Sequence, residues 1–159
     1  MDFKIARDED AYKIYDFCKE MIRTDARMSF TDGTSLSVIE NWLLDEAVTL
    51  YIAVEDDMVA AMFRAKRGSG NKSHSAYIAC AVHPTFRRRE LASKLTLFGL
   101  EDQKRKGVVI ARTYIYSWNK PSIKTIEKCG FELAGRVSMH EYEKTLNAYI
   151  DDLIYHKVL

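Results

Sequence analysis

Features that define several whole classes of protein are scarce in this chain of 159 residues. It has only three cysteines, Cys18, Cys80 and Cys129, which are far apart in the sequence and lie among apolar residues. An odd number of scattered cysteines argues against a disulfide framework and indicates reduced thiols, so we expect a cytoplasmic protein. The sequence also has no CxxC pair and no pair of histidines at the spacing of a metal site, so we expect no metal.

Long apolar runs and an excess of one charge are also missing. No segment is apolar over the length that spans a bilayer, and the start, MDFKIARDED, is too charged for a secretory signal. We therefore expect no membrane partner. The 24 Lys and Arg residues nearly balance the 23 Asp and Glu residues, which gives a formal net charge of +1. Because a dedicated nucleic-acid binder usually carries a strong basic excess, we expect no nucleic-acid partner.

Apolar residues are plentiful, at 47% of the chain, and they recur with regular periods. This length and composition predict a single domain over residues 1–159 with one sizeable core. The period-two and mixed apolar runs predict strands over residues 2–6, 48–54, 58–65, 76–82, 108–116, 131–142 and 148–158. The helical periods predict helices over about 11–22, 38–44, 87–106 and 120–129, capped in turn by Asp8 or Asp10, by Ser35 or Ser37, and, for the last helix, by Asn119. This order predicts a mixed α/β sheet with helices on both faces.

The stretch AVHPTFRRRELASKL, residues 81–95, is the most informative part of the chain. A core strand ends near Pro84, and a helix with a basic start follows it. A strand that turns into a helix directs several unpaired amides toward one point, where the helix dipole is positive. Arg87, Arg88 and Arg89 add positive charge at that point. The stretch therefore predicts a cradle for a phosphate or pyrophosphate; the alternative is a solvated basic turn.

Two blocks of residues here resemble motifs of the GNAT superfamily of acyl-CoA-dependent N-acyltransferases. The first motif, V-x-P-x-(aromatic)-R-x-x-G-x-G/A, is matched by Val82, Pro84, Phe86, Arg87 and Ala92. The second motif, N-x-x-(A/S)-I-x-x-x-x-K-x-G-F, is matched by Asn119, Ser122, Ile123, Lys128, Gly130 and Phe131. The two blocks occur in the family's order with a helix and a strand between them, and the combination is more specific than either block alone. The resemblance is strongest over residues 76–131.

The resemblance implies both a fold and an activity. The fold is an α/β (α+β) single domain with a mixed, mostly antiparallel sheet of about seven strands, flanked by helices on both faces. The activity is transfer of an acetyl group from acetyl-CoA, or of another acyl group from its acyl-CoA, directly to a primary amine of a small molecule or protein. The alternatives are a catalytically degenerate acyl-CoA-binding or regulatory domain, a nucleic-acid-binding module and a helix-presenting interaction protein.

The expected cofactor site combines the basic turn with the strand before it. We predict that backbone amides from Arg88 to Ser93 hold the pyrophosphate. The resemblance implies that the pantetheine arm lies along residues 80–82 like an added strand, beside Asn119 and Ser122. These two residues equally suit a helix cap and an ordinary first turn. The candidate cofactor-binding residues are Cys80, Ala81, Val82, Arg87, Arg88, Arg89, Glu90, Leu91, Ala92, Ser93, Asn119 and Ser122.

The sequence departs from the family pattern at two positions that bear on the chemistry. Glu90 stands where the motif has glycine, so either its carboxylate points away, pairing with a neighbouring Arg or Lys94, or cofactor affinity is reduced. Ile126 stands where many members have a tyrosine acid, and isoleucine cannot donate a proton. The candidate catalytic residues are therefore Tyr114, Tyr116 and Ser117, on or just after the strand beside the expected acyl site. The alternative for the tyrosines is an ordinary half-buried place in a strand.

Other polar residues are weaker candidates. His74 is suited to act as a base or to lie at the surface between a loop and a strand, and His83 is expected in a turn. The polar stretch 23–34 is the expected meeting place of the acceptor amine, with Asp25 and Asp32 able to attract a cation. The apolar chain end, LIYHKVL, is suited either to complete the sheet or to pair with a second copy in a homodimer.

Overall fold

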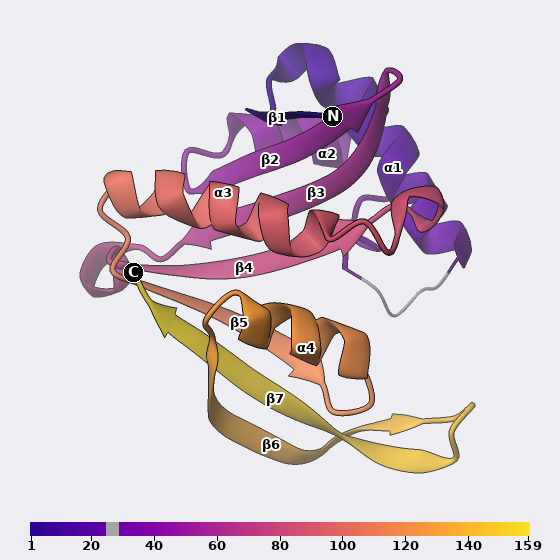
Figure 1. Cartoon of the computed structure of the whole chain (residues 1–159), viewed down its shortest axis with the longest axis vertical. Coiled ribbons are helices and arrows are strands. Elements are labelled where there is room, and N and C mark those ends of the chain that lie inside the picture. Colours follow the sequence, from indigo (N-terminus) through magenta and orange to yellow (C-terminus); the bar gives the residue numbers. More distant parts are fainter. Residues whose placement is uncertain (25–28) are drawn as a thin grey trace.

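The computed structural model describes residues 1–24 and 29–159, and these form one seven-stranded sheet with helices on both faces (Figure 1). The strand order is β1-β2-β3-β4-β5-β7-β6. The strands are β1 (Asp2–Ile5), β2 (Val48–Glu55), β3 (Met58–Arg67), β4 (Ser75–Val82), β5 (Ile110–Tyr116), β6 (Glu132–Glu143) and β7 (Ala148–Val158). The α-helices are α1 (Ala11–Thr24), α2 (Leu36–Leu44), α3 (Leu91–Arg105) and α4 (Lys120–Lys128). Neighbouring strands are antiparallel except for the parallel pair β4 and β5, so the expected mixed, mostly antiparallel sheet is confirmed.

Two apolar cores hold the helices against the sheet. One lies under α1 and α2, where Ile14 and Ile39 pack with Ile52 and Met62 of the sheet. The other lies under α3 and α4, and its fully buried members include Tyr51, Phe63 and Leu95.

The helix α3 packs closely against the sheet at Gly99. A Cβ atom added to Gly99 would lie 2.6 Å from the Phe63 ring, so only glycine lets α3 pack this close to β3. This close approach fixes the position of α3, whose first residues border the cavity described below.

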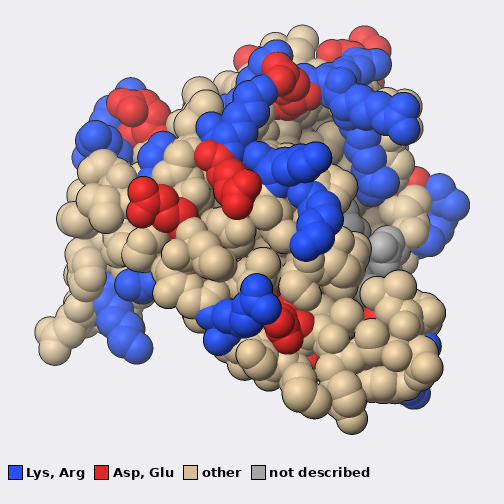
Figure 2. Space-filling model, turned by 60° about the horizontal axis from the view of Figure 1, so that its bottom comes forward, with Lys and Arg blue, Asp and Glu red and all other residues tan. Residues whose placement is uncertain are grey.

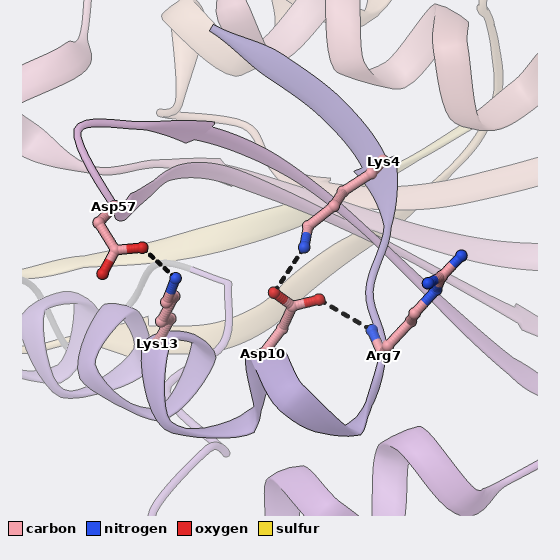
Figure 3. A network of polar contacts seen from close by, with 5 residues as sticks. All are labelled: Lys4, Arg7, Asp10, Lys13 and Asp57. Atoms are coloured by element: carbon pink, nitrogen blue, oxygen red, sulfur yellow. Dashed lines mark hydrogen bonds and ion pairs between the residues drawn. The ribbon is translucent and has the colours of Figure 1, made fainter.

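A polar network fixes the start of α1 (Figure 3). The Asp10 carboxylate accepts hydrogen bonds from the Lys4 ammonium at 2.7 Å and from the Arg7 amide at 3.0 Å. Lys13, one turn along the helix, pairs with Asp57 in the turn between β2 and β3. The network therefore joins β1, α1 and the β2–β3 hairpin. The Asp10 carboxylate bonds the Arg7 amide before the helix and makes no hydrogen bond to an α1 amide, so the predicted capping of α1 by Asp10 is not what the structure shows.

The long helix starts later than its apolar period predicted. We expected it from about residue 87, but α3 begins at Leu91. Arg88 and Glu90 have left-handed backbone angles, with φ of 65° and 59°, and a right-handed helix cannot continue through them. Residues 87–90 therefore form a tight turn in front of the helix.

The end of the chain completes the sheet. β7 lies between β5 and β6 and pairs antiparallel with both, so neither of its edges is free to pair with a second copy. The edge strand on this side is β6, which is exposed along most of its length.

Candidate active site

The parallel strands β4 and β5 separate partway along their length, and the site is built at this point. They pair over only three residue pairs, from Ser75 with Ile110 to Tyr77 with Arg112. Beyond Tyr77 the two strands diverge (Figure 1), although β4 stays paired with β3 up to Val82. The β5-facing edge of residues 78–82 therefore has no strand partner among the described residues.

A cavity of about 420 Å³ fills the opening between the strands. Because side chains alternate along a strand, Ile78 and Cys80 face α3 and α4, whereas Tyr77 and Ala79 face the other side of the sheet. The cavity is thus lined from both faces. Its lining residues are Ser29, Tyr77, Ile78, Ala79, Cys80, Ala92, Thr96, Thr113, Tyr114, Ile115, Tyr116, Asn119, Ser122, Thr125, Ile126 and Asp152.

The basic turn at residues 87–90 leads into the cavity on the α3 side. Ala92, in the first turn of α3, lines the cavity, and the first amides of this helix have no partner within it. The side chains of Arg87 and Arg88 are exposed and make no hydrogen bond or ion pair with any described residue. Arg89 is engaged, since it donates to Glu55 at 2.8 Å. The turn thus offers two unpaired cations directly before the first turn of α3, whose Ala92 lines the cavity.

Glu90 points away from this turn toward α4. Its carboxylate pairs with Lys128 in the last turn of α4, and not with an arginine or with Lys94, so the predicted partner was wrong. The hydrogen bond from Lys128 lowers the pKa of the Glu90 carboxyl. The predicted orientation away from the turn agrees with this pairing. The positive charge of Lys128 partly offsets the negative charge of the Glu90 carboxylate.

The start of α4 forms another wall of the cavity. The Asn119 side chain caps the helix by accepting a hydrogen bond from the Ser122 amide at 3.3 Å, and both residues line the cavity. The two functions weighed for Asn119, capping and contact with a bound cofactor, are therefore compatible. Ile126, at the position of the family's tyrosine acid, is buried and also lines the cavity.

Tyrosines line the other side of the cavity. Tyr114 lies beside Tyr77, with ring centroids 5.6 Å apart, and Tyr116 donates a hydrogen bond to Glu141 at 2.7 Å. The hydrogen bond to Glu141 raises the pKa of Tyr116 to about 12, so its phenol is protonated at neutral pH. Tyr114 and Tyr116 thus share one strand face in the cavity, as their period-two spacing predicted.

Other predicted site residues lie outside the cavity lining. Ser117 follows β5, and its amide donates to the Asp151 carbonyl at 3.0 Å. His83 caps a short turn, with its ring nitrogen Nδ1 accepting from the Thr85 amide at 3.3 Å. The remaining ones are Ala81, Val82, His74, residues 87–91 and Ser93. Asp25 and Arg27 lie outside the described residues, and Asp32 forms an ion pair with Arg64 at 3.1 Å.

Sequence reasoning missed five polar residues of the cavity, and it covered a sixth, Ser29, only as part of the polar stretch 23–34. The five are Tyr77, Thr96, Thr113, Thr125 and Asp152. Tyr77 could have been found from its place in the core strand, because it lies two residues before Ala79 and so points to the same face of the sheet. Asp152 carried no local pattern, because it joins the site only through the pairing of β7 with β5. Burial raises the pKa of the Asp152 carboxyl.

The cysteine in the cavity is not a nucleophile at neutral pH. Burial raises the pKa of the Cys80 thiol to about 12, and the reactive form of cysteine is the thiolate. Its sulfur lies 3.8 Å from the Ala92 carbonyl oxygen, to which the thiol donates a weak hydrogen bond. This geometry disfavours an acyl-cysteine intermediate.

A comparison with protein-family models shows the family of the chain. Residues 9–131 match the model of the acetyltransferase (GNAT) family. The chain belongs to the GNAT acetyltransferase family. It is therefore an N-acetyltransferase that uses acetyl-CoA as its acyl donor, as the two motifs predicted. The nucleic-acid-binding and interaction-protein alternatives do not agree with this assignment.

Solved structures share the fold along the whole GNAT chain. A ribosomal-protein-alanine N-acetyltransferase from Brucella melitensis has a TM-score of 0.86 and 16% identity, with 100% of both chains covered. An N-acetyltransferase from Staphylococcus aureus Mu50 has a TM-score of 0.84 and 17% identity, covering 99% of this chain and 97% of its own. No curated protein sequence matches this chain. The TM-scores show a common fold. Because the identities are low, the acceptor has to be argued from the site.

The surface of this acetyltransferase carries charges of both signs. On the face drawn in Figure 2, Lys and Arg side chains are interleaved with Asp and Glu side chains. In the described part of the chain, no helix is both long and apolar enough to span a lipid bilayer.

Proposed function

We propose that this chain, as a single domain over residues 1–159, transfers the acetyl group of acetyl-CoA directly to a primary amine of a small molecule or protein. The observation that carries the proposal is the cavity between β4 and β5, which is lined from both faces of the sheet. One side combines an open strand edge with a basic turn, and the other side carries tyrosines and a carboxylate. Donor and acceptor can thus meet in the opening from opposite sides.

The donor side fits the extended, anionic shape of acetyl-CoA. The open edge of β4 at residues 78–82 can pair with the amide groups of the pantetheine arm, as an added strand would. Asn119 and Ser122 lie along the same path. Arg87 and Arg88, with the amides from residue 88 to Ser93, suit the pyrophosphate at the start of α3. Arg89 supports the turn through Glu55 and adds to the positive charge.

The acceptor side supplies proton donors for the leaving thiolate. The Tyr114 hydroxyl makes no hydrogen bond with any described residue, so it is available to a ligand in the cavity. Tyr116 stays protonated at neutral pH, so it cannot act as a base, and it can donate to a ligand only by exchanging its hydrogen bond to Glu141. Ser117 is assigned a supporting function at the end of β5, since its amide anchors the strand to Asp151. Direct transfer agrees with the unreactive Cys80 thiol.

The cellular setting is also part of the proposal. All three cysteines are free thiols, and Cys18 and Cys129 are buried, which suits the reducing environment of the cytoplasm. A homodimer stays a prediction; because β7 is internal, such a dimer would have to use the edge strand β6 or another surface.

The donor site is tested by isothermal titration with acetyl-CoA, with free coenzyme A alongside. Changing Arg87, Arg88 and Arg89 together to Ala should weaken binding at least about tenfold, because charge-assisted hydrogen bonds to phosphate are lost. The matched control changes Lys104, Arg105 and Lys106 to Ala, which removes three positive charges from the other end of α3. Equal affinities in the wild type and the 87–89 variant would overturn the pyrophosphate assignment.

The acceptor side is tested by thiol release from acetyl-CoA in the presence of butylamine, 1,4-diaminobutane, lysine amide or alanine amide. Changing both Tyr114 and Tyr116 to Phe should lower kcat with at least one of these amines while the Kd for acetyl-CoA stays within twofold. Full activity in the double variant would remove both tyrosines from the mechanism. Absence of thiol release with every amine, together with tight acetyl-CoA binding, would count against a small primary amine as acceptor.

A further inference from the structure

We propose that Asp152 receives the ammonium group of the acceptor and removes its proton before acetyl transfer, which makes a cationic primary amine the substrate class of this site. The inference rests on the proposed function, because it places the acceptor on the tyrosine side of the cavity. It adds a catalytic group that neither GNAT motif contains, since both motifs end before β7.

The position of Asp152 follows from the strand register. β5 and β7 are antiparallel, and Asp152 lies directly opposite Tyr116, so their side chains point to the same face of the sheet. Tyr114 precedes Tyr116 by two residues and shares this face, and the Tyr77 ring lies beside Tyr114. All four side chains line the cavity. The Asp152 carboxylate therefore faces the open space where an acceptor must lie.

This carboxylate is unpaired, whereas its neighbours are engaged. Asp151 pairs with Arg136 at 2.8 Å, on the opposite face of the same strand. Glu141 accepts the hydrogen bond of the Tyr116 hydroxyl. By contrast, Asp152 forms no hydrogen bond or ion pair with any of the residues that the structure describes. A half-buried acid without a partner in a cavity is a natural site for a positively charged group.

The charged and titratable groups around Asp152 come from three strands. They are His140 and Glu141 on β6, Tyr114 and Tyr116 on β5, and Tyr77 on β4. Burial raises the pKa of the Asp152 carboxyl, Glu141 raises it further, and His140 partly offsets the rise. A raised pKa makes the carboxylate a better base toward an ammonium ion. The rings of Tyr77 and Tyr114 add faces that favour an alkylammonium over an anionic acceptor.

All protons of the reaction are accounted for when the Asp152 carboxylate takes the first one. The ammonium, R–NH₃⁺, gives one proton to the Asp152 carboxylate and becomes a neutral amine. The amine nitrogen then forms the new C–N bond at the thioester carbonyl, and the C–S bond breaks with its electron pair on sulfur. A second proton from nitrogen goes to the thiolate, for which Tyr114 is a suitable relay. The products are the amide, the free thiol and protonated Asp152, which releases its proton to solvent.

The deciding experiment compares the full chain with the variants Asp152→Asn and Asp152→Glu and with the matched control Asp151→Asn. The substrate is the amine of the panel above with the highest kcat/KM. We expect kcat/KM to fall about 100-fold or more in Asp152→Asn, to recover in part in Asp152→Glu, and to stay near the wild-type value in the control. The Kd for acetyl-CoA should stay within twofold in all variants.

The pH profile separates a base from a merely structural residue. In the wild type, kcat/KM should rise with pH as Asp152 loses its proton. In Asp152→Asn this limb should disappear, and the residual rate should follow the deprotonation of the free amine in solution. A wild-type profile or a wild-type rate in Asp152→Asn would overturn the proposal while leaving the acetyltransferase assignment intact.

A binding measurement keeps the inference testable if no panel amine is acetylated. Butylammonium chloride is titrated into the coenzyme A complex of the wild type and of Asp152→Asn, with the binding followed by NMR. Binding that is present in the wild type and at least tenfold weaker in the variant supports the ammonium site. Equal binding in both proteins, or none in either, contradicts it, whereas failure of acetyl-CoA to bind the wild type contradicts the donor site of the proposed function.

Discussion

The two halves of the sheet differ in how they are covered. β1 to β4 have helices on both faces, α1 and α2 on one and α3 on the other, and residues such as Ile52 and Phe63 are 0% exposed. In the other half, α4 lies over β5 (Figure 1) and bonds β7 through Tyr155 and Glu127, and Leu133 of β6 is 53% exposed. The first half is therefore covered on both faces, and the second half leaves side chains exposed on the face opposite α4.

This difference assigns separate tasks to the two sides of the cavity. The proposed donor side uses main-chain groups of β4 and the start of α3, next to the well-packed first half. The proposed acceptor side uses side chains of β5 and β7, on the face of the sheet opposite α4. Such side chains can change without disturbing the core, so acceptor choice can vary while the donor site is kept.

The largest expected effect is a loss of stability when a core side chain of the first half is removed. Phe63→Ala should lower the free energy of unfolding by about 3–5 kcal/mol, because it leaves a cavity between Tyr51 and α3 in a fully packed core. The matched change in the second half, Leu133→Ala, should cost no more than about 0.5 kcal/mol, since that side chain is half exposed. Urea unfolding measures both. Similar losses in the two variants would show that the halves contribute equally to stability.

An intermediate effect is expected from a buried chain of hydrogen bonds that joins β2 to α3. The Tyr51 hydroxyl donates to Asp102 at 2.6 Å and accepts from the Gln103 side chain at 2.7 Å. Tyr51→Phe leaves the buried Gln103 amide without its partner, which should cost about 1–3 kcal/mol. The control is Tyr149→Phe on β7, where the ring is 61% exposed and unfolding should be nearly unchanged. A loss in the control as large as that in Tyr51→Phe would remove the contrast between the halves.

Local sequence patterns predicted the parts of the molecule that depend on short-range rules. The cap at Ser35, which accepts from the Val38 amide at 3.4 Å, and the cap at Asn119 follow from residue types within a few positions. The strand and helix order followed from apolar periods and agreed with the sheet. The proposed donor side depends on the same short-range rules, because one continuous stretch from β4 to α3 builds most of it.

The acceptor side was not visible for a physical reason. Tyr77 and Asp152 are 75 positions apart, and they meet only because β4, β5 and β7 are neighbours in one register. The partner of Glu90 was mispredicted for the same reason, since Lys128 is 38 residues away in sequence. Periodicity places a residue on a face of its own strand or helix, but it does not say which distant side chain lies opposite.

The smallest expected effect concerns the tie between the halves. Glu90 begins the helix that packs on the first half, and it pairs with Lys128 at the end of the helix that packs on the second. Its φ of 59° is a conformation that glycine adopts freely, and glycine is the residue of the family motif at this position. Glu90→Gly should bind acetyl-CoA as tightly as the wild type or about twofold more tightly, because a negative charge near the pyrophosphate is removed. Isothermal titration measures this.

The control Glu90→Gln separates charge from backbone conformation, since it removes the carboxylate but keeps a side chain at a positive φ. Equal tightening in both variants would assign the effect to charge, and tightening in the glycine variant alone would assign it to the turn. Markedly weaker binding in both would mean that the Glu90–Lys128 pair holds α3 and α4 in the spacing that the donor needs. In that case the halves would be coupled through this pair, and the division of tasks between them would not extend to the mouth of the cavity.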